Sequence, residues 1–274
     1  SQDPRHQKII LNRLGWLHSP EWAAERVDEL KGFTAGIRKA GFKKVVLLGM
    51  GGSSLAPEVY RKVFGVAKGY LDLLVLDSTD PRAIRSVEKA IDLKKTLFLV
   101  SSKSGGTIEV QSLFKYFYAK LSKGKQAGAG SHFVAITDPD TALGEQAKKM
   151  GFRKTFINPA DIGGRYSALS YFGLVPASLI GIDLKTLIER AQVVVDRCYA
   201  NVPAQENAGV RIGAGLAVLG REGRDKVTFV LSPKLRSWGD WVEQLIAEST
   251  GKEGKELLPV VGEESGDISS YGSD

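Results

Sequence analysis

The run Ser102-Lys103-Ser104-Gly105-Gly106-Thr107 has the composition of an anion-binding loop. It follows apolar residues 96–100, typical of a β-strand, and precedes residues 110–121, whose apolar side chains recur at the spacing of one helix face. Glycines let backbone N–H groups approach an anion, a helix N-terminus adds partial positive charge, and the hydroxyls and the Lys103 ammonium supply further donors. These residues predict a phosphate site, although a polar turn with Thr107 at the helix cap fits the same pattern.

A second glycine-rich loop, Gly49-Met50-Gly51-Gly52-Ser53-Ser54, follows apolar residues 44–48. It partly matches a dinucleotide-binding fingerprint, with Asp77 as the ribose-binding acid, but Ser54 occupies the place of the third glycine. The first loop does not match a P-loop, because Lys103 precedes its glycines. Two such loops suit a small phosphorylated ligand held between them, and helix capping by Ser53 and Ser54 is the alternative.

Arg165 follows Gly163-Gly164 and precedes a run of almost only apolar or small residues that ends at Ile180. A guanidinium near the positive end of a helix dipole is unfavourable unless an anion is present. Arg165 could therefore stabilise an anionic ligand or a developing oxyanion, and an ion pair with Asp161 is the structural alternative.

Glu248 is the candidate base. Trp238, Trp241, Leu245 and Glu248 share one helical face, with Gln244 one turn before Glu248. A carboxylate beside tryptophans is partly desolvated, and desolvation raises its pKa and its strength as a base. A pair with Lys252 four residues later is the alternative.

These side chains must be positioned by alternating strands and helices. Residues 20–40 predict one helix, and residues 168–180 predict a buried helix that Pro176 should kink or restart as a new turn. Five short apolar runs predict strands at residues 44–48, 71–76, 96–100, 132–137 and 154–157. Their alternation with helical patterns predicts an α/β fold with a doubly wound five-stranded parallel sheet of flavodoxin-like type, whose ligand loops lie at the carboxyl edge.

The rest of the sequence predicts the beginning of a second α/β module. Helical patterns at residues 208–220 and 237–249 accompany strand patterns at residues 226–231 and 257–261, and a helical pattern at residues 184–199 could cross from the first module to this one. Two strands and two helices cannot close an independent core, so we expect this module to be incomplete. The predicted organisation is a helical extension at 1–40, a first domain at 41–182, a connecting helix at 183–207 and a truncated second domain at 208–274.

Composition excludes several classes of protein. The net charge of +7 is dispersed along the chain, whereas nucleic-acid-binding proteins usually cluster their basic residues. His6, His18 and His132 are far apart, which argues against a multi-histidine metal site and a Ser-His-Asp hydrolase. Cys198 is the single cysteine and is typical of a reducing cytoplasm, and no apolar run approaches the length of a membrane span.

The glycine-rich loops, Gly163-Gly164-Arg165-Tyr166-Ser167 and the run from Gln244 to Lys252 resemble, in this order, successive motifs of the glucose-6-phosphate isomerase family. The first two motifs are shared by sugar isomerase (SIS) domains, and the arginine and glutamate motifs are more particular. The sequences of these motifs are most similar to those of the isomerase half of bacterial bifunctional transaldolase/glucose-6-phosphate isomerases.

The resemblance implies an intramolecular oxidoreductase of glycolysis and gluconeogenesis that interconverts glucose 6-phosphate and fructose 6-phosphate without metal or cofactor. It implies that Ser102, Ser104 and Thr107 hold the phosphate, with help from Lys103 and from Gly52-Ser53. It also implies that Glu248 moves the proton between C2 and C1, that Arg165 stabilises the cis-enediolate, and that Gln244 lies against the ligand. A cytoplasmic homodimer is the expected assembly of the full-length protein.

The sequence departs from the family in one respect. The family uses a later histidine, donated by the neighbouring subunit, and a late lysine for ring opening, but no histidine follows His132 here. We therefore expect a truncated piece with impaired activity. The alternative function is a non-catalytic sugar-phosphate-binding SIS module that regulates a partner, and a dinucleotide-dependent enzyme ranks third.

Overall fold

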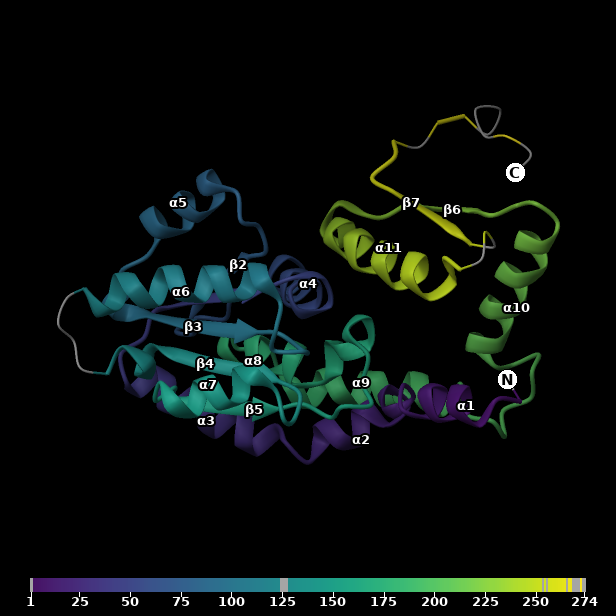
Figure 1. The fold of residues 1–274 in the computed structure, drawn as a ribbon. Coiled ribbons are helices and arrows are strands. Elements are labelled where there is room, and N and C mark those ends of the chain that lie inside the picture. Colours follow the sequence, from purple (N-terminus) through teal and green to yellow (C-terminus); the bar gives the residue numbers. More distant parts are fainter. Residues whose placement is uncertain are drawn as a thin grey trace. The chain divides into compact units, whose positions relative to one another are not determined.

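The computed structural model describes residues 2–123, 128–252, 254, 256–264, 266–267 and 272. The chain divides into two compact units, Ser1–Ile188 and Glu189–Asp274, and helix α9 (Leu184–Asp196) contains the boundary between them. Figure 1 shows the ribbon of both units. Among the described residues, no helix combines the length and apolar character needed to cross a bilayer.

The first unit is built on a parallel five-stranded sheet in the order β2-β1-β3-β4-β5. Its strands are β1 (Lys44–Gly49), β2 (Asp72–Leu76), β3 (Thr96–Ser101), β4 (Phe133–Thr137) and β5 (Lys154–Ile157). The register pairs Gly49 with Ser101 at the carboxyl ends of β1 and β3. The predicted doubly wound parallel sheet is confirmed.

Helices cover both faces of this sheet, as Figure 1 shows. These helices are α2 (Ser19–Ala24), α3 (Val27–Lys39), α4 (Leu55–Phe64), α5 (Pro81–Ala90), α6 (Ile108–Ser122), α7 (Ala142–Lys149) and α8 (Tyr171–Leu179). Helix α1 (Pro4–Leu11) precedes them and buries none of its residues. Successive side chains of a strand point to opposite faces, so Leu97 and Leu99 join the core with α3 and α8, whereas Phe98 and Val100 join the core with α6 and α7. Both cores therefore hold the carboxyl edge of the sheet in place.

The single helix predicted over residues 20–40 is wrong, because the chain breaks between α2 and α3. The Trp22 carbonyl accepts a hydrogen bond from Arg26 Nη1 at 2.6 Å, and the Arg26 guanidinium lies 4.1 Å from the Trp22 ring centre. The Arg26 amide donates to the Ala23 carbonyl instead of to Trp22, which tightens the last turn of α2 and ends it.

Helix α8 is buried along its whole length, as its sequence predicts. Ser170 caps its first turn, since the Ser170 hydroxyl accepts a hydrogen bond from the Phe172 amide at 3.4 Å. Pro176 lies inside the helix, which continues to Leu179. A turn of 3-10 helix, η5 (Gly164–Leu169), precedes Ser170, so residues 164–169 do not belong to α8.

The second unit contains the strand pair β6 (Lys226–Phe229) and β7 (Leu258–Val261), which is parallel. Helices α10 (Ala208–Arg221) and α11 (Arg236–Thr250) accompany this pair. Helix α11 packs closely on β7 through Gly239, where an added Cβ would lie 3.3 Å from the Val261 Cβ. The predicted elements are thus present as an α/β arrangement of two helices and two strands.

Candidate functional site

The two glycine-rich loops follow the neighbouring strands β1 and β3 at the carboxyl edge of the sheet. The chain runs from β1 outward to β2 and then returns to the other side of β1 to form β3. At such a switch point the loops that follow the two strands diverge, and ligands of open α/β sheets bind there. The Ser101 hydroxyl donates to the Ser53 carbonyl at 3.3 Å, so the two loops are joined at their bases.

The first candidate element is the phosphate loop, residues 102–107. Ser102 and Thr107 hydroxyl oxygens are 2.9 Å apart, which closes the loop with a hydrogen bond. The Ser104 hydroxyl is exposed and accepts from the Gly106 amide at 3.3 Å. Thr107 occupies the N-cap position of α6, but its side chain makes no capping hydrogen bond to the first helical turn. The loop therefore presents hydroxyls in front of a helix N-terminus that its threonine leaves uncapped.

Gly105 is required for the shape of the phosphate loop. Its φ of +70° is in the left-handed region, where a side chain is strained. A Cβ at Gly105 would also lie 2.8 Å from the Thr141 Cβ and 3.0 Å from the Leu143 amide nitrogen. The loop can pack against the start of α7 only with glycine at this position.

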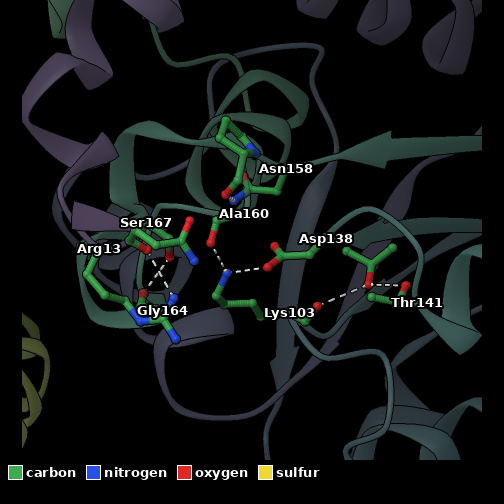
Figure 2. A network of polar contacts seen from close by, with 11 residues as sticks. Arg13, Lys103, Asp138, Thr141, Asn158, Ala160, Gly164 and Ser167 are labelled. Carbon is green, nitrogen blue, oxygen red and sulfur yellow. Dashed lines mark hydrogen bonds and ion pairs between the residues drawn. The ribbon is translucent and has the colours of Figure 1, made fainter. Parts of the chain in front are cut away.

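Lys103 extends from the phosphate loop toward the loops after β4 and β5 (Figure 2). Its ammonium forms an ion pair with Asp138 and donates to the Ala160 carbonyl at 3.0 Å. Burial raises the pKa of the Asp138 carboxyl, and the hydrogen bond from Lys103 only partly offsets that effect. The ammonium is engaged by these two groups in the structure, and direct contact between Lys103 and a phosphate stays a prediction.

The loop after β1 carries Gly52, Ser53 and Ser54. Ser54 occupies the N-cap position of α4, yet its hydroxyl donates to the Gly51 carbonyl at 3.1 Å and makes no capping bond. Helix capping by the Ser54 side chain, the structural alternative, is therefore wrong. The Ser53 residue is only 9% exposed, and its carbonyl accepts the hydrogen bond from Ser101.

Gly52 brings the loop after β1 into backbone contact with the arginine loop, residues 163–167. A Cβ at Gly52 would lie 2.4 Å from the Gly164 carbonyl carbon and 3.0 Å from the Arg165 amide nitrogen. The Ser167 hydroxyl lies within hydrogen-bonding distance of two carbonyl oxygens, that of Gly52 at 3.2 Å and that of Gly164 at 2.6 Å. The arginine loop is thus fixed against the loop after β1, whose base is joined to that of the phosphate loop.

Arg165 is half-buried and is the second residue of η5. Its guanidinium lies 5.5 Å from the centre of the Tyr166 ring, which stacks on Trp16 with ring centres 5.0 Å apart. The sequence predicted Arg165 directly before the buried helix, but α8 begins only at Tyr171. The backbone that positions Arg165 is therefore held by η5 and by Gly52 and not by the start of α8.

Glu248 and Gln244 belong to the second unit and lie one turn apart on α11. Gln244 Nε2 donates to Glu248 Oε1 at 2.8 Å, and Lys252 Nζ donates to the Glu248 backbone carbonyl at 2.7 Å. The Glu248 side chain is exposed, so the predicted desolvation beside the tryptophans is wrong within this unit. Trp238 packs against Phe229 with ring centres 5.8 Å apart, which places it near the other end of the helix from Glu248.

Two features of the first unit were not predicted from the sequence. Asp138 could have been found by the rule used for the two loops, since it directly follows β4, the neighbour of β3. Arg13, which lies beside Gly164 in Figure 2, precedes the sheet by many residues, and no local pattern indicates its position. Among the described residues, no group of three His, Cys, Asp or Glu side chains could hold a metal ion.

Comparison with known proteins gives one consistent result. A family model described as phosphoglucose isomerase matches residues 24–273. The glucose-6-phosphate isomerase of Campylobacter jejuni is 32% identical over 241 residues, covering 88% of this chain and 57% of that protein. That of Carboxydothermus hydrogenoformans is 31% identical over 256 residues, covering 90% of this chain and 55% of that protein. The chain spans about half the length of the curated relatives it matches.

Solved structures agree with the sequence matches. A hypothetical protein from Thermus thermophilus superposes with a TM-score of 0.80 at 31% identity, over 92% of this chain and 60% of that chain. A glucose-6-phosphate isomerase from Chlamydia trachomatis superposes with a TM-score of 0.73 at 27% identity, over 87% of this chain and 48% of that chain. A tagatose-6-phosphate ketose/aldose isomerase from Escherichia coli, at 14% identity and a TM-score of 0.53, shares the fold.

Proposed function

The chain belongs to the phosphoglucose isomerase family, and from this membership we propose that it binds a phosphorylated sugar and takes part in the interconversion of glucose 6-phosphate and fructose 6-phosphate. The observation that carries the proposal is the phosphate loop, which presents Ser102, Ser104 and Thr107 at the β1/β3 switch point. The relatives that cover most of this chain are named glucose-6-phosphate isomerases, and their reaction fits such a site.

The phosphate end of the substrate is held by the loop hydroxyls and by the amides around Gly105 and Gly106. Charge-assisted hydrogen bonds to a phosphate are about twice as strong as neutral ones. Ser53 lies at the base of the neighbouring loop and completes the phosphate-binding group. Because the phosphate does not react, its binding energy positions the sugar for the chemical step.

The chemical step is a proton transfer between two adjacent carbons. The Glu248 carboxylate removes the proton from C2 of the open-chain aldose, and the C1 carbonyl oxygen takes up the negative charge as an enolate. The C2 hydroxyl proton moves to O1, and return of the carbon proton from Glu248 to C1 leaves a hydroxyl on C1 and a carbonyl at C2. The Arg165 guanidinium stabilises the enediolate, since it stays protonated at all working pH values. Gln244 orients the Glu248 carboxylate through the hydrogen bond that it donates.

The binding half of the proposal is tested with the double variant Ser104→Ala, Thr107→Ala. We expect the affinity for fructose 6-phosphate, measured by calorimetry, to fall at least about tenfold, since two hydroxyl contacts are removed. Ser112→Ala is the matched control, because that hydroxyl is exposed on α6 and donates to the Ile108 carbonyl at 2.7 Å. Unchanged affinity of the double variant would refute the phosphate loop as the binding element.

The catalytic half is tested with Glu248→Gln. We expect exchange of the C2 proton of the sugar with deuterated solvent, followed by NMR, to be abolished, while phosphate binding persists. Glu243→Gln on the opposite side of α11 is the control, and its exchange rate should stay at the wild-type value. Exchange that survives in Glu248→Gln would remove Glu248 as the base.

A regulatory SIS module without catalysis is the second candidate function. It predicts sugar-phosphate binding by the wild-type chain without any C2 exchange, so the same NMR experiment separates the two functions. The cytoplasmic location, the homodimer, the transaldolase fusion and the reduced turnover of this chain by itself stay predictions.

A further inference from the structure

Lys103 and Asp138 are joined twice. The Lys103 ammonium pairs with the Asp138 carboxylate, and the Asp138 amide donates to the Lys103 carbonyl at 3.2 Å. The Thr137 hydroxyl donates to the same carbonyl at 3.3 Å. The phosphate loop is therefore attached to the end of β4 through both the backbone and the side chain of one residue.

The same ammonium also reaches the loop after β5. It donates to the Ala160 carbonyl, five residues before Arg165 in the sequence (Figure 2). The Asn158 amide at the start of that loop donates to the Thr137 carbonyl at 2.8 Å. Lys103 thus links three consecutive loops of the carboxyl edge, namely those after β3, β4 and β5.

The Lys103–Asp138 ion pair is partly buried, which distinguishes it from a fully exposed surface pair. The Lys103 side chain is 27% exposed and the Asp138 side chain 14% exposed. When one partner of a partly buried pair is removed, the other charge loses its compensation in a site that water only partly reaches, so the two partners are coupled. A carboxylate so close to a phosphate-binding loop is unfavourable to an anion by simple electrostatics and requires another reason for its presence.

We propose that Lys103 is an internal brace of the candidate site, which holds the phosphate loop and the arginine loop in fixed positions relative to each other. Asp138 is a positioning residue that acts through Lys103. This inference rests on the proposed function of the site. In this proposal the Lys103 ammonium is paired with groups of the protein itself and is not a direct ligand of the phosphate.

The brace and simple electrostatics predict opposite changes in the affinity for fructose 6-phosphate when Asp138 is replaced by asparagine. Asp138→Asn removes a negative charge near the phosphate loop, so a purely electrostatic role would strengthen the binding of an anion. The brace predicts that affinity for fructose 6-phosphate falls at least about tenfold, because the Lys103 ammonium loses its partner and the loop loses its attachment. Calorimetry on the 274-residue chain measures the dissociation constant directly.

Asp140→Asn is the matched control. Asp140 lies in the same loop, is exposed, and has a φ of 56°, a conformation that asparagine adopts readily. It removes an equal charge without breaking the brace, so its affinity should be unchanged or slightly higher. Equal shifts of the same sign in Asp138→Asn and Asp140→Asn would overturn the proposal.

The double variant Lys103→Met, Asp138→Asn tests whether the two residues act as a unit. Each single variant should bind fructose 6-phosphate more weakly than wild type. The dissociation constant of the double variant should exceed that of the weaker-binding single variant by no more than about twofold. Losses that multiply would mean that Lys103 and Asp138 act independently and would refute the brace. This pattern of coupling also separates the brace from general destabilisation, which lowers the melting temperature without such non-additivity.

The proposed function is tested by a different comparison from the one that tests the brace. If the wild-type chain binds fructose 6-phosphate and Ser104→Ala, Thr107→Ala does not, the phosphate site stands whatever the brace variants show. Affinity in Asp138→Asn that equals or exceeds wild type then overturns the brace alone. Absence of wild-type binding would overturn both.

Discussion

The backbone contact between Gly52 and Gly164 makes a sharp prediction for the variant Gly52→Ala. The added methyl would lie 2.4 Å from the Gly164 carbonyl carbon and 2.5 Å from its oxygen, both well inside normal contact distances. Since both neighbours are backbone atoms, no side-chain rotation relieves the overlap, and one of the two loops must move.

Overpacking of this kind costs about 2 to 3 kcal/mol of unfolding free energy. For a unit of 188 residues, that loss corresponds to a drop in melting temperature of about 5 to 10 °C. Thermal unfolding monitored by circular dichroism measures it. Calorimetry should also show weaker binding of fructose 6-phosphate, because the loop that carries Ser53 is displaced together with Gly52.

Gly164→Ala is the matched control from the other side of the same contact. A Cβ at Gly164 would meet only the Gly52 Cα, at 3.9 Å, which is an ordinary contact distance. We therefore expect its melting temperature and affinity to stay near wild type. Equal effects of the two alanine substitutions, or a wild-type melting temperature for Gly52→Ala, would refute the reasoning from backbone contact.

Three further variants test other parts of the first unit. Gly105→Ala should lose about 1 to 3 kcal/mol of stability because of its left-handed φ and the nearby Thr141 Cβ, and wild-type urea unfolding would contradict this. Asp80→Ala removes the cap of α5, whose carboxylate accepts from the Arg82 amide at 2.7 Å, and should cost about 1 kcal/mol by the same assay. For Glu58, burial raises the carboxyl pKa, but hydrogen bonds and ion pairs with Arg61 and Lys62 outweigh burial and lower it. Its contribution is therefore present above the ordinary carboxyl pKa and lost as the pH falls through the lowered value, so Glu58→Gln should be less stable than wild type at neutral pH only; a difference that persists in strong acid would contradict this.

The fold was predictable because each strand is an apolar run bounded by loop residues. All five strands of the first unit lie within two residues of their predicted ends, and the loop positions follow from the parallel arrangement. The break between α2 and α3 was not predictable from spacing, because it depends on the Arg26 side chain taking the Trp22 carbonyl. Apolar periodicity does not record which hydrogen bond a long polar side chain makes.

Some features of the candidate site were likewise predictable from the sequence, and others were not. The positions of the phosphate loop and the arginine loop follow from the strands that they succeed. The direction of the Lys103 side chain does not, since four rotatable bonds let its ammonium reach Asp138 as readily as a ligand. The exposure of Glu248 also escaped prediction, because sharing a helical face with tryptophans does not bring a residue within reach of their rings.

The hydrogen bond between Ser167 and Gly52 spans 115 residues of sequence. During synthesis the loop after β1 leaves the ribosome long before the arginine loop that supports it. The early strands therefore lack the backbone contact at Gly52 until that later segment has been made. Contacts of such long range form late and slow the final folding step. A stalled or cleaved nascent chain ending before Gly164 would therefore carry the phosphate loop without the backbone that seats its neighbour.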